Sequence, residues 1–332
     1  MTRLRAGIRI CALLCALLTL CSCTLPWQSN EPQTVVRVSD AEVGADLYTY
    51  YLSRILHDPN AFGLTDPDRS AAEQKAVELC TQGVAVNTLF AEQGLRLTPA
   101  YKTRIAENVS VKWSLYQNYY AKVGVRKQTL TAYETTAAKR EMLIAHKYGA
   151  GGSAAVSQIE LDANYAVNYV TFRSINGYLT RTGADGKSER LPQSEITAIE
   201  NRFKQMCDDI RTGTSIETVS KENASAEGIL SGETQTVTIN RTTSNYPPEF
   251  FTRVQQMDVG TPRVIETEDY IFLVVKQSPK SDENLETHRL SCLLDMCAEP
   301  FGKELSAKIA GYKVQKNSSL LGDIYAAVSK QF

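Results

Sequence analysis

The chain has 332 residues, enough for two domains of ordinary size, and its 43% hydrophobic and 22% charged residues are typical of a globular protein. The formal net charge is −1, and the basic residues form no stripe along the sequence. Proteins that bind nucleic acid usually concentrate basic residues on one face, so the composition argues against nucleic acid as a main partner.

The first 22 residues are typical of a targeting segment. They hold three arginines and no acidic residue, and residues 8–20 form a mostly apolar stretch that is too short to span a bilayer comfortably. The following "LCSC", residues 20–23, places a small residue directly before a cysteine and an aliphatic residue two places before the small one. This pattern resembles a bacterial lipoprotein signal with Cys23 as the lipid-bearing residue. An ordinary secretory peptide that is cleaved nearby is the alternative.

A lipid on Cys23 would hold the protein at the outer face of the bacterial cell membrane, because buried acyl chains anchor a protein to a bilayer. Residues 23–39 are polar and contain proline, and they are predicted to be a tether. The expected location is therefore extracytoplasmic, with the membrane as one partner through the lipid.

Four cysteines remain after the signal and Cys23. No C-x-x-C pair and no neighbouring histidine accompanies them, so we expect neither a metal site nor a cofactor. The favoured interpretation is that they are small, buried apolar side chains, and a Cys80–Cys292 bridge is the alternative. The four are Cys80, Cys207, Cys292 and Cys297.

Residues 40–166 are predicted to be helical, because apolar residues recur there at spacings of three and four. Glycine-rich residues 149–153 break the series before a last, shorter helix at about 156–168. The predicted helix starts are Asp40, Asp68 or Ser70, and Thr98 followed by Pro99.

Aromatic side chains are frequent on these helices. Trp113, Tyr116 and Tyr120 share the apolar stripe of the third helix, so we expect them to pack in the core. Tyr119 lies off that stripe and is the candidate contact residue for a bound polypeptide, since tyrosine combines apolar area with a hydrogen-bonding tip.

Residues 167–278 differ in pattern and predict the element order β-α-α-β-α-β-β. The strand "YVTFRSI" opens this series, and a tight turn at residues 267–269 separates its last two strands. The two predicted helices that follow the first strand are Gln193–Arg211 and a short helix after Gly213, and a third helix begins at Pro247 and Pro248. Residues 279–332 return to helix, with a short extended piece at 312–314.

Three stretches of residues 155–277 resemble parvulin-type peptidyl-prolyl isomerase domains. They are "VSQIELDANYAVNYVTFRSI", "FKQMCDDIRTGTSIETVSKE" and "YPPEFFTRVQQMDVGTPRVIETEDYIFLVVK". The helices before and after them give a layout similar to that of the lipid-anchored extracytoplasmic foldases. The resemblance implies an α+β fold, in which a mainly helical chaperone-like domain (residues 40–166, with 279–332 packing back on it) carries an inserted parvulin-like domain at 167–278.

The resemblance also shows which catalytic groups are missing. Parvulin domains keep two histidines that face each other in the sheet, and these positions fall at Arg173, within one residue, and at Ile271. The family's acidic or thiol position falls near Ala226, which makes Glu227 and Arg173 the only, and weak, catalytic candidates. An alternative interpretation of Arg173 is a surface arginine at the edge of the sheet.

The apolar pocket that receives proline in this family is partly kept, and Tyr246 and Phe250 are its candidate peptide-binding residues. Because the barrier to rotation about a peptide bond is about 18–20 kcal/mol, a domain without the histidines is expected to be a poor catalyst. The sequence therefore predicts a membrane-anchored foldase or chaperone that binds unfolded, nascent or proline-containing secreted polypeptides. The alternatives are an active isomerase with a rearranged site and a non-enzymatic envelope lipoprotein.

Overall fold

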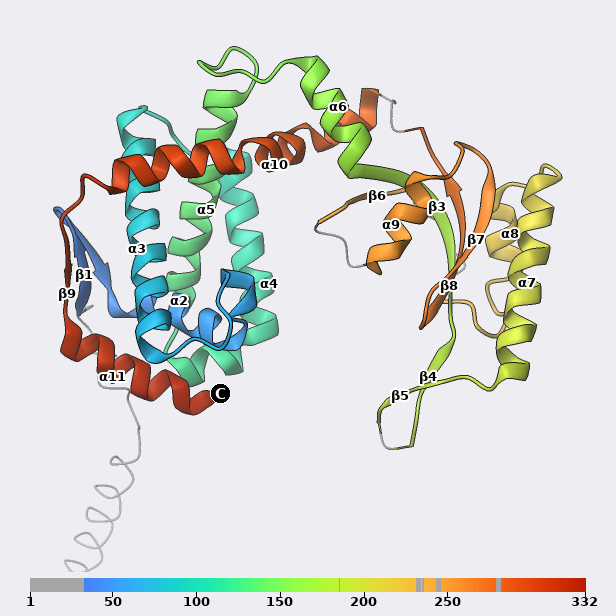
Figure 1. Cartoon of the computed structure of the whole chain (residues 1–332), viewed down its shortest axis with the longest axis horizontal. Coiled ribbons are helices and arrows are strands. Elements are labelled where there is room, and N and C mark those ends of the chain that lie inside the picture. Colours follow the sequence, from blue (N-terminus) through green and yellow to red (C-terminus); the bar gives the residue numbers. More distant parts are fainter. Residues whose placement is uncertain (1–32, 185, 231–233, 235, 243–245, 279–281) are drawn as a thin grey trace, which may run out of the picture. The chain divides into compact units, whose positions relative to one another are not determined.

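A computed structural model describes residues 33–184, 186–230, 234, 236–242, 246–278 and 282–332 (Figure 1). The predicted signal and the lipid attachment at Cys23 lie outside these residues. The fold is α+β and divides into two compact units. The helical unit comprises the chain up to Lys147 together with Cys297–Phe332, and the sheet unit comprises Tyr148–Met296. The sheet unit therefore runs from residue 148 to residue 296, whereas the inserted domain was expected at residues 167–278.

The helical unit is built from long helices around one apolar core. As predicted, Asp68 and Thr98 cap two of them: the side chain of Asp68 accepts from Ala71 N at 2.7 Å, and that of Thr98 accepts from Tyr101 N at 3.4 Å. Its elements are α2 (Ala45–His57), η1 (Asn60–Phe62), α3 (Arg69–Glu92), α4 (Pro99–Val123), α5 (Lys127–Tyr148), the last part of α10 (Asp282–Ile309), α11 (Ser318–Val328) and η2 (Ser329–Gln331).

A small sheet near the start of this unit departs from the prediction. β1 (Thr34–Val38) pairs antiparallel with both β2 (Ala41–Gly44) and β9 (Val314–Lys316), and Figure 1 shows β1 and β9 side by side. Residues 34–38, expected in the tether, are therefore a strand whose valines are buried in the core. Asp40 lies in the turn between β1 and β2 and caps no helix, since α2 begins after Gly44.

The sheet unit has the predicted β-α-α-β-α-β-β order. Its four strands are antiparallel in the order β6-β3-β8-β7, so β3 and β8 are central. The strands are β3 (Tyr169–Tyr178), β6 (Thr236–Asn240), β7 (Pro262–Glu266) and β8 (Tyr270–Lys276), and the helices are α6 (Gln158–Asn168), α7 (Gln193–Arg211), α8 (Ile216–Glu222) and α9 (Pro248–Gln255). A separate hairpin, β4 (Thr180–Thr182) and β5 (Ser188–Arg190), interrupts the polar loop after β3.

Two apolar cores cover the two faces of this sheet. Since alternate strand residues point to opposite faces, Ile175 packs with α7 and α8 on one face, and Phe172 packs with α9 on the other. Figure 1 shows α7 and α8 on one side of the strands and α9 on the other. The face on which a β3 or β8 residue lies therefore decides which residues it can act with.

The states of the four cysteines decide between the two interpretations of these residues. Cys80, Cys207, Cys292 and Cys297 are all buried thiols, so the alternative of a Cys80–Cys292 bridge is wrong. Burial raises the pKa of the Cys80 thiol. Among the described residues, no helix combines the length and apolar character needed to cross a membrane.

Candidate functional site

Arg173 lies on the central strand β3, so its interpretation as a residue of the sheet edge is wrong. Its guanidinium forms an ion pair with Glu217 of α8, and its Nε donates to Thr236 Oγ1 at 3.1 Å. Both contacts hold the side chain across the α7–α8 face of the sheet. An arginine bound in this way has fewer donors left for a substrate carbonyl.

The two positions expected to carry histidines do not face each other. Arg173 pairs with Val275 of β8, whereas Ile271 pairs with Gly177, four residues further along β3. Ile271 is buried in the core beneath α7 and has no polar side-chain atom. Glu227 lies elsewhere, exposed on the loop after α8, where its backbone carbonyl accepts from Arg202.

Tyr246 and Phe250 lie on the opposite face of the sheet from Arg173. Their rings stack with centroids 4.7 Å apart, and both contact Phe172 and Phe272. Phe172 directly precedes Arg173 and Phe272 directly follows Ile271, so each expected histidine position has a phenylalanine as a neighbour in the chain. Phe250 is 0% exposed and Tyr246 is partly exposed, so of these two residues Tyr246 is the one that a peptide can contact.

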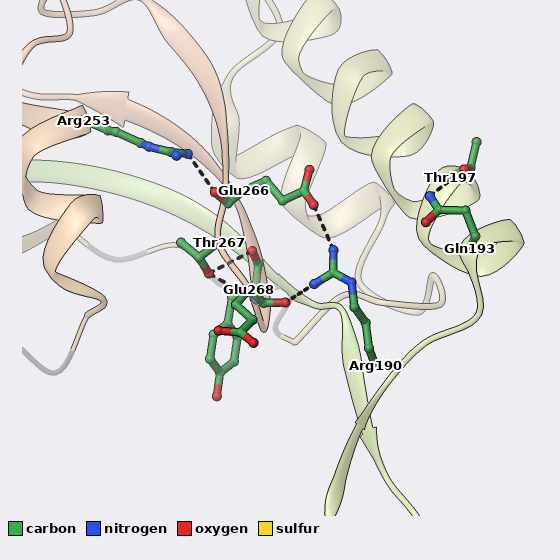
Figure 2. A network of polar contacts seen from close by, with 8 residues as sticks. Arg190, Gln193, Thr197, Arg253, Glu266, Thr267 and Glu268 are labelled. Atoms are coloured by element: carbon green, nitrogen blue, oxygen red, sulfur yellow. Dashed lines mark hydrogen bonds and ion pairs between the residues drawn. The ribbon is translucent and has the colours of Figure 1, made fainter.

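A polar network fixes the turn between β7 and β8 (Figure 2). Arg190 of β5 forms an ion pair with Glu266 at 3.2 Å and donates to the carbonyl oxygen of Glu268. Arg253 of α9 donates to the carbonyl oxygen of Glu266 at 2.7 Å. These arginines bind backbone and carboxylate groups of the sheet unit itself, which makes their role structural.

The helical unit contains a cleft of about 480 Å³ between α2, η1 and α4. Residues one helical turn apart on α2 and on α4 project from facing helices into the same space. Most of the residues that line it are aromatic, and its polar groups are tyrosine hydroxyls and a few charged or titratable side chains. The cleft is lined by Tyr50, Arg54, His57, Asp58, Ala61, Phe62, Lys112, Tyr116, Tyr119 and Tyr120.

The structure places the α4 aromatic residues partly as predicted. Tyr119, the predicted contact residue, lines the cleft, and its hydroxyl donates to Ser53 O at 3.2 Å. Burial of this ring raises the pKa of its hydroxyl. Tyr120 is buried and stacks with Trp113, but Tyr116 is 52% exposed, so its assignment to the core is wrong. The α4 stripe reaches the edge of the helix packing at Tyr116, where the cleft replaces a neighbouring helix.

Arg54 is one of the cleft residues that the sequence analysis did not single out. Its Nη1 donates to the hydroxyl of Tyr133 at 2.9 Å, and its Cζ lies 5.3–5.7 Å from the ring centroids of Tyr50, Phe62 and Tyr133. No carboxylate of the described residues lies within the 4.0 Å that defines an ion pair with it. The i, i+4 spacing of Tyr50 and Arg54 was the only signal in the sequence.

The second cation of the cleft is neutralised within the protein. Lys112 forms an ion pair with Glu134 of α5, which also accepts from Asn108 Nδ2 at 3.1 Å. Glu134 is buried, so this pairing satisfies a carboxylate that would otherwise be costly to bury. Arg54 thus differs from Lys112 in having no acidic partner among the described residues. Those residues also hold no group of three or more His, Cys, Asp or Glu side chains arranged to bind a metal ion.

No protein-family model and no curated protein sequence matches the chain. It is similar to solved structures of foldase protein PrsA from Streptococcus pneumoniae, with 13% identity, a TM-score of 0.36 and coverage of 88% of this chain and 91% of that chain. The foldase protein (PrsA) of Lactococcus lactis is 13% identical with a TM-score of 0.37, and the match covers 89% of this chain and 99% of that chain. A peptidylprolyl isomerase (PrsA) of Bacillus anthracis is 15% identical with a TM-score of 0.25, and the match covers 70% of this chain and 94% of that chain.

Proposed function

We propose that the protein is an extracytoplasmic foldase or chaperone that holds unfolded secreted polypeptides in the cleft of its helical unit. The observation that carries this proposal is an open cleft of about 480 Å³ with aromatic walls on three elements. Tyrosine rings bind varied apolar side chains, and their hydroxyls bind the peptide backbone, so such a cleft suits many sequences rather than one.

In this proposal the sheet unit has the shape of a prolyl isomerase without its chemistry. Support comes from the predicted strand and helix order, and from Arg173, Ile271, Phe172 and Phe272 at or beside the positions where the resemblance expects histidines. Tyr246 is its proposed contact for proline-containing segments, and buried Phe250 supports that ring from below. Rotation about a prolyl bond gains little from the rings of Phe172 and Phe272, because phenylalanine offers no polar group.

We also propose that a lipid on Cys23 keeps the cleft at the outer surface of the membrane, where secreted chains emerge. The support is the sequence pattern around Cys23. Metabolic labelling with a fatty-acid analogue tests it: the wild-type protein should become labelled, and the Cys23→Ser variant should not. Equal labelling of both proteins would overturn the assignment of this residue.

Suppression of aggregation tests the holding function. The full-length protein should reduce light scattering by a chemically unfolded client in proportion to its concentration, and Tyr119→Ala should weaken the effect. Tyr101→Ala is the matched control, because Tyr101 lies on the same helix, is similarly half-buried and does not line the cleft. Equal suppression by both variants, or none by the wild type, would contradict the proposal.

A protease-coupled assay on a proline peptide separates the foldase from an active isomerase. We expect no acceleration above the uncatalysed rate, with wild type and Arg173→Ala indistinguishable. Robust turnover that Arg173→Ala abolishes would favour the alternative of an isomerase with a rearranged site.

A further inference from the structure

The environment of Arg54 is unusual for a cation in a protein cleft. A guanidinium carries five N–H donors in a rigid fork, and one of them is used on Tyr133. Three rings surround it, which holds its plane in place through cation–π contacts. It therefore presents oriented donors at the wall of a cleft lined largely by aromatic residues.

We propose that Arg54 recognises a carboxylate of the bound polypeptide, so that the cleft selects segments in which an acidic residue lies close to an aromatic one. This inference deepens the proposed function and rests on it. Arginine and carboxylate match each other through two parallel hydrogen bonds, which are stronger and more specific than bonds to a neutral group. Recognition costs little reorganisation because the guanidinium is already held by its rings.

The acidic groups nearest to the cleft are already engaged elsewhere. Glu134 is bound by Lys112 and Asn108. Asp58 lines the cleft, but its Oδ1 accepts from Ala61 N at 3.2 Å and so shapes the η1 turn. The partner that Arg54 lacks within the described chain is thus left to the bound polypeptide.

The rim of the cleft, formed by His57 and Tyr119, indicates where the aromatic residue of that segment lies. The ring of Phe332 is half exposed and lies 5.9 Å from His57 and 6.2 Å from Tyr119, measured between centroids. This contact shows that the rim accepts an aromatic side chain. His57 is one helical turn from Arg54, a distance that an extended chain covers in about one to two residues.

The surface beside the rim continues the apolar path. Leu115 is 68% exposed and lies three residues after Lys112 and four before Tyr119, both of which line the cleft. Val111, one turn earlier on α4, is 58% exposed. A segment bound at Arg54 and the rim therefore has an apolar surface along α4 for its flanking residues.

Two short fluorescent peptides test the inference on the full-length protein. They have glycine-serine flanks and a tyrosine, and they differ only in the residue two places after it, which is aspartate in one and asparagine in the other. Fluorescence anisotropy should give about tenfold tighter binding of the aspartate peptide, the effect of one charge-assisted contact. The difference should shrink as salt is added.

Variants assign the preference to Arg54. In Arg54→Gln the two peptides should bind within about twofold of each other, while Arg96→Gln, which removes an exposed charge outside the cleft, should keep the tenfold preference. Thermal unfolding checks that each variant is folded. If Arg54→Gln is not folded, Arg54→Lys replaces it, and it should keep the charge but lose most of the preference, because a lysine cannot form the paired bonds.

The outcomes separate this inference from the proposed function. Equal binding of both peptides by the wild type, or an unchanged preference in Arg54→Gln, overturns carboxylate recognition and leaves peptide holding intact. If neither peptide binds and client aggregation is not suppressed, then the proposed function itself fails.

Discussion

Both units gather aromatic rings, but the phenylalanine cluster of the sheet unit is closed, whereas tyrosines of the helical unit border a cleft. In the sheet unit, Phe172, Phe250 and Phe272 pack at centroid distances of 4.6 and 5.3 Å and are almost completely buried. In the helical unit, Tyr116 and Tyr119 border an open cleft. Helix α9 places Phe250 directly on the strand residues Phe172 and Phe272 and so closes their cluster, whereas helix axes that lie about 8–10 Å apart leave a gap where a neighbour ends. Aromatic content alone therefore identifies neither a core nor a site.

The largest expected effect breaks the closed cluster of the sheet unit. Phe250→Ala should lower its free energy of unfolding by about 3–5 kcal/mol, because it removes a fully buried ring and leaves a cavity. Hydrogen exchange of the β8 amides measures this unit separately. Tyr246→Phe, which keeps the stacked ring, is the control and should cost less than about 1 kcal/mol. A loss below 1 kcal/mol for Phe250→Ala would mean that the cluster is loosely packed and open to peptides.

A smaller effect is expected on peptide affinity when an exposed tyrosine is replaced in each unit. Tyr116→Ala should weaken binding of a tyrosine-containing peptide about fivefold, equivalent to about 1 kcal/mol, because its ring borders the cleft. Tyr270→Ala is the matched change in the sheet unit, where the ring is 41% exposed, and should leave binding unchanged. Anisotropy titrations measure the peptide affinity of both variants, and an equal loss of affinity in the two would place the binding surface outside the cleft.

The smallest expected effect is a pH dependence of the sheet unit. Burial lowers the pKa of His288, which lies against the rings of Tyr165 and Tyr169. The folded unit therefore binds a proton less readily than the unfolded chain, whose histidine titrates near about 6.5. Its stability should be fully present above that pH and should decline as the pH falls below it.

Denaturation of the sheet unit at several pH values between neutral and mildly acid measures how steeply its free energy of unfolding falls with pH. His288→Gln should flatten this dependence, and His146→Gln, in the helical unit, should not. An identical slope in His288→Gln would assign the proton uptake to other groups.

Local patterns predicted the sheet unit well. Helix α7 has the predicted bounds because its apolar residues repeat with helical period between Pro192, which precedes its first residue, and Gly213, which follows its end with a positive φ. The tight turn at residues 267–269 was predicted because a polar break separates two apolar, β-branched runs. In each case the deciding information lies within about twenty residues of sequence.

The features that were missed depend on distant partners. β1 pairs both with the neighbouring β2 and with β9, about 275 residues later in the sequence, and no local pattern reports the second partner. Tyr116 sits on the apolar stripe of α4, but its side chain borders the cleft and is 52% exposed. Arg54 acquires its role only when α2, η1 and α5 bring three rings around it. The sequence predicted one cleft residue, Tyr119, from its position off the stripe.

The pairing of β1 with β9 has a consequence for biosynthesis. The sheet unit is continuous in sequence and is complete once Met296 has been translated, but the helical unit still lacks β9 and α11, which packs on α2 and α3. Chains fold by domains as they are made, so the later unit waits for its last residues. The helical unit that carries the cleft on α2 and α4 is therefore completed only after β9 and α11 have been translated, and a product that ends before Val314 would lack both elements.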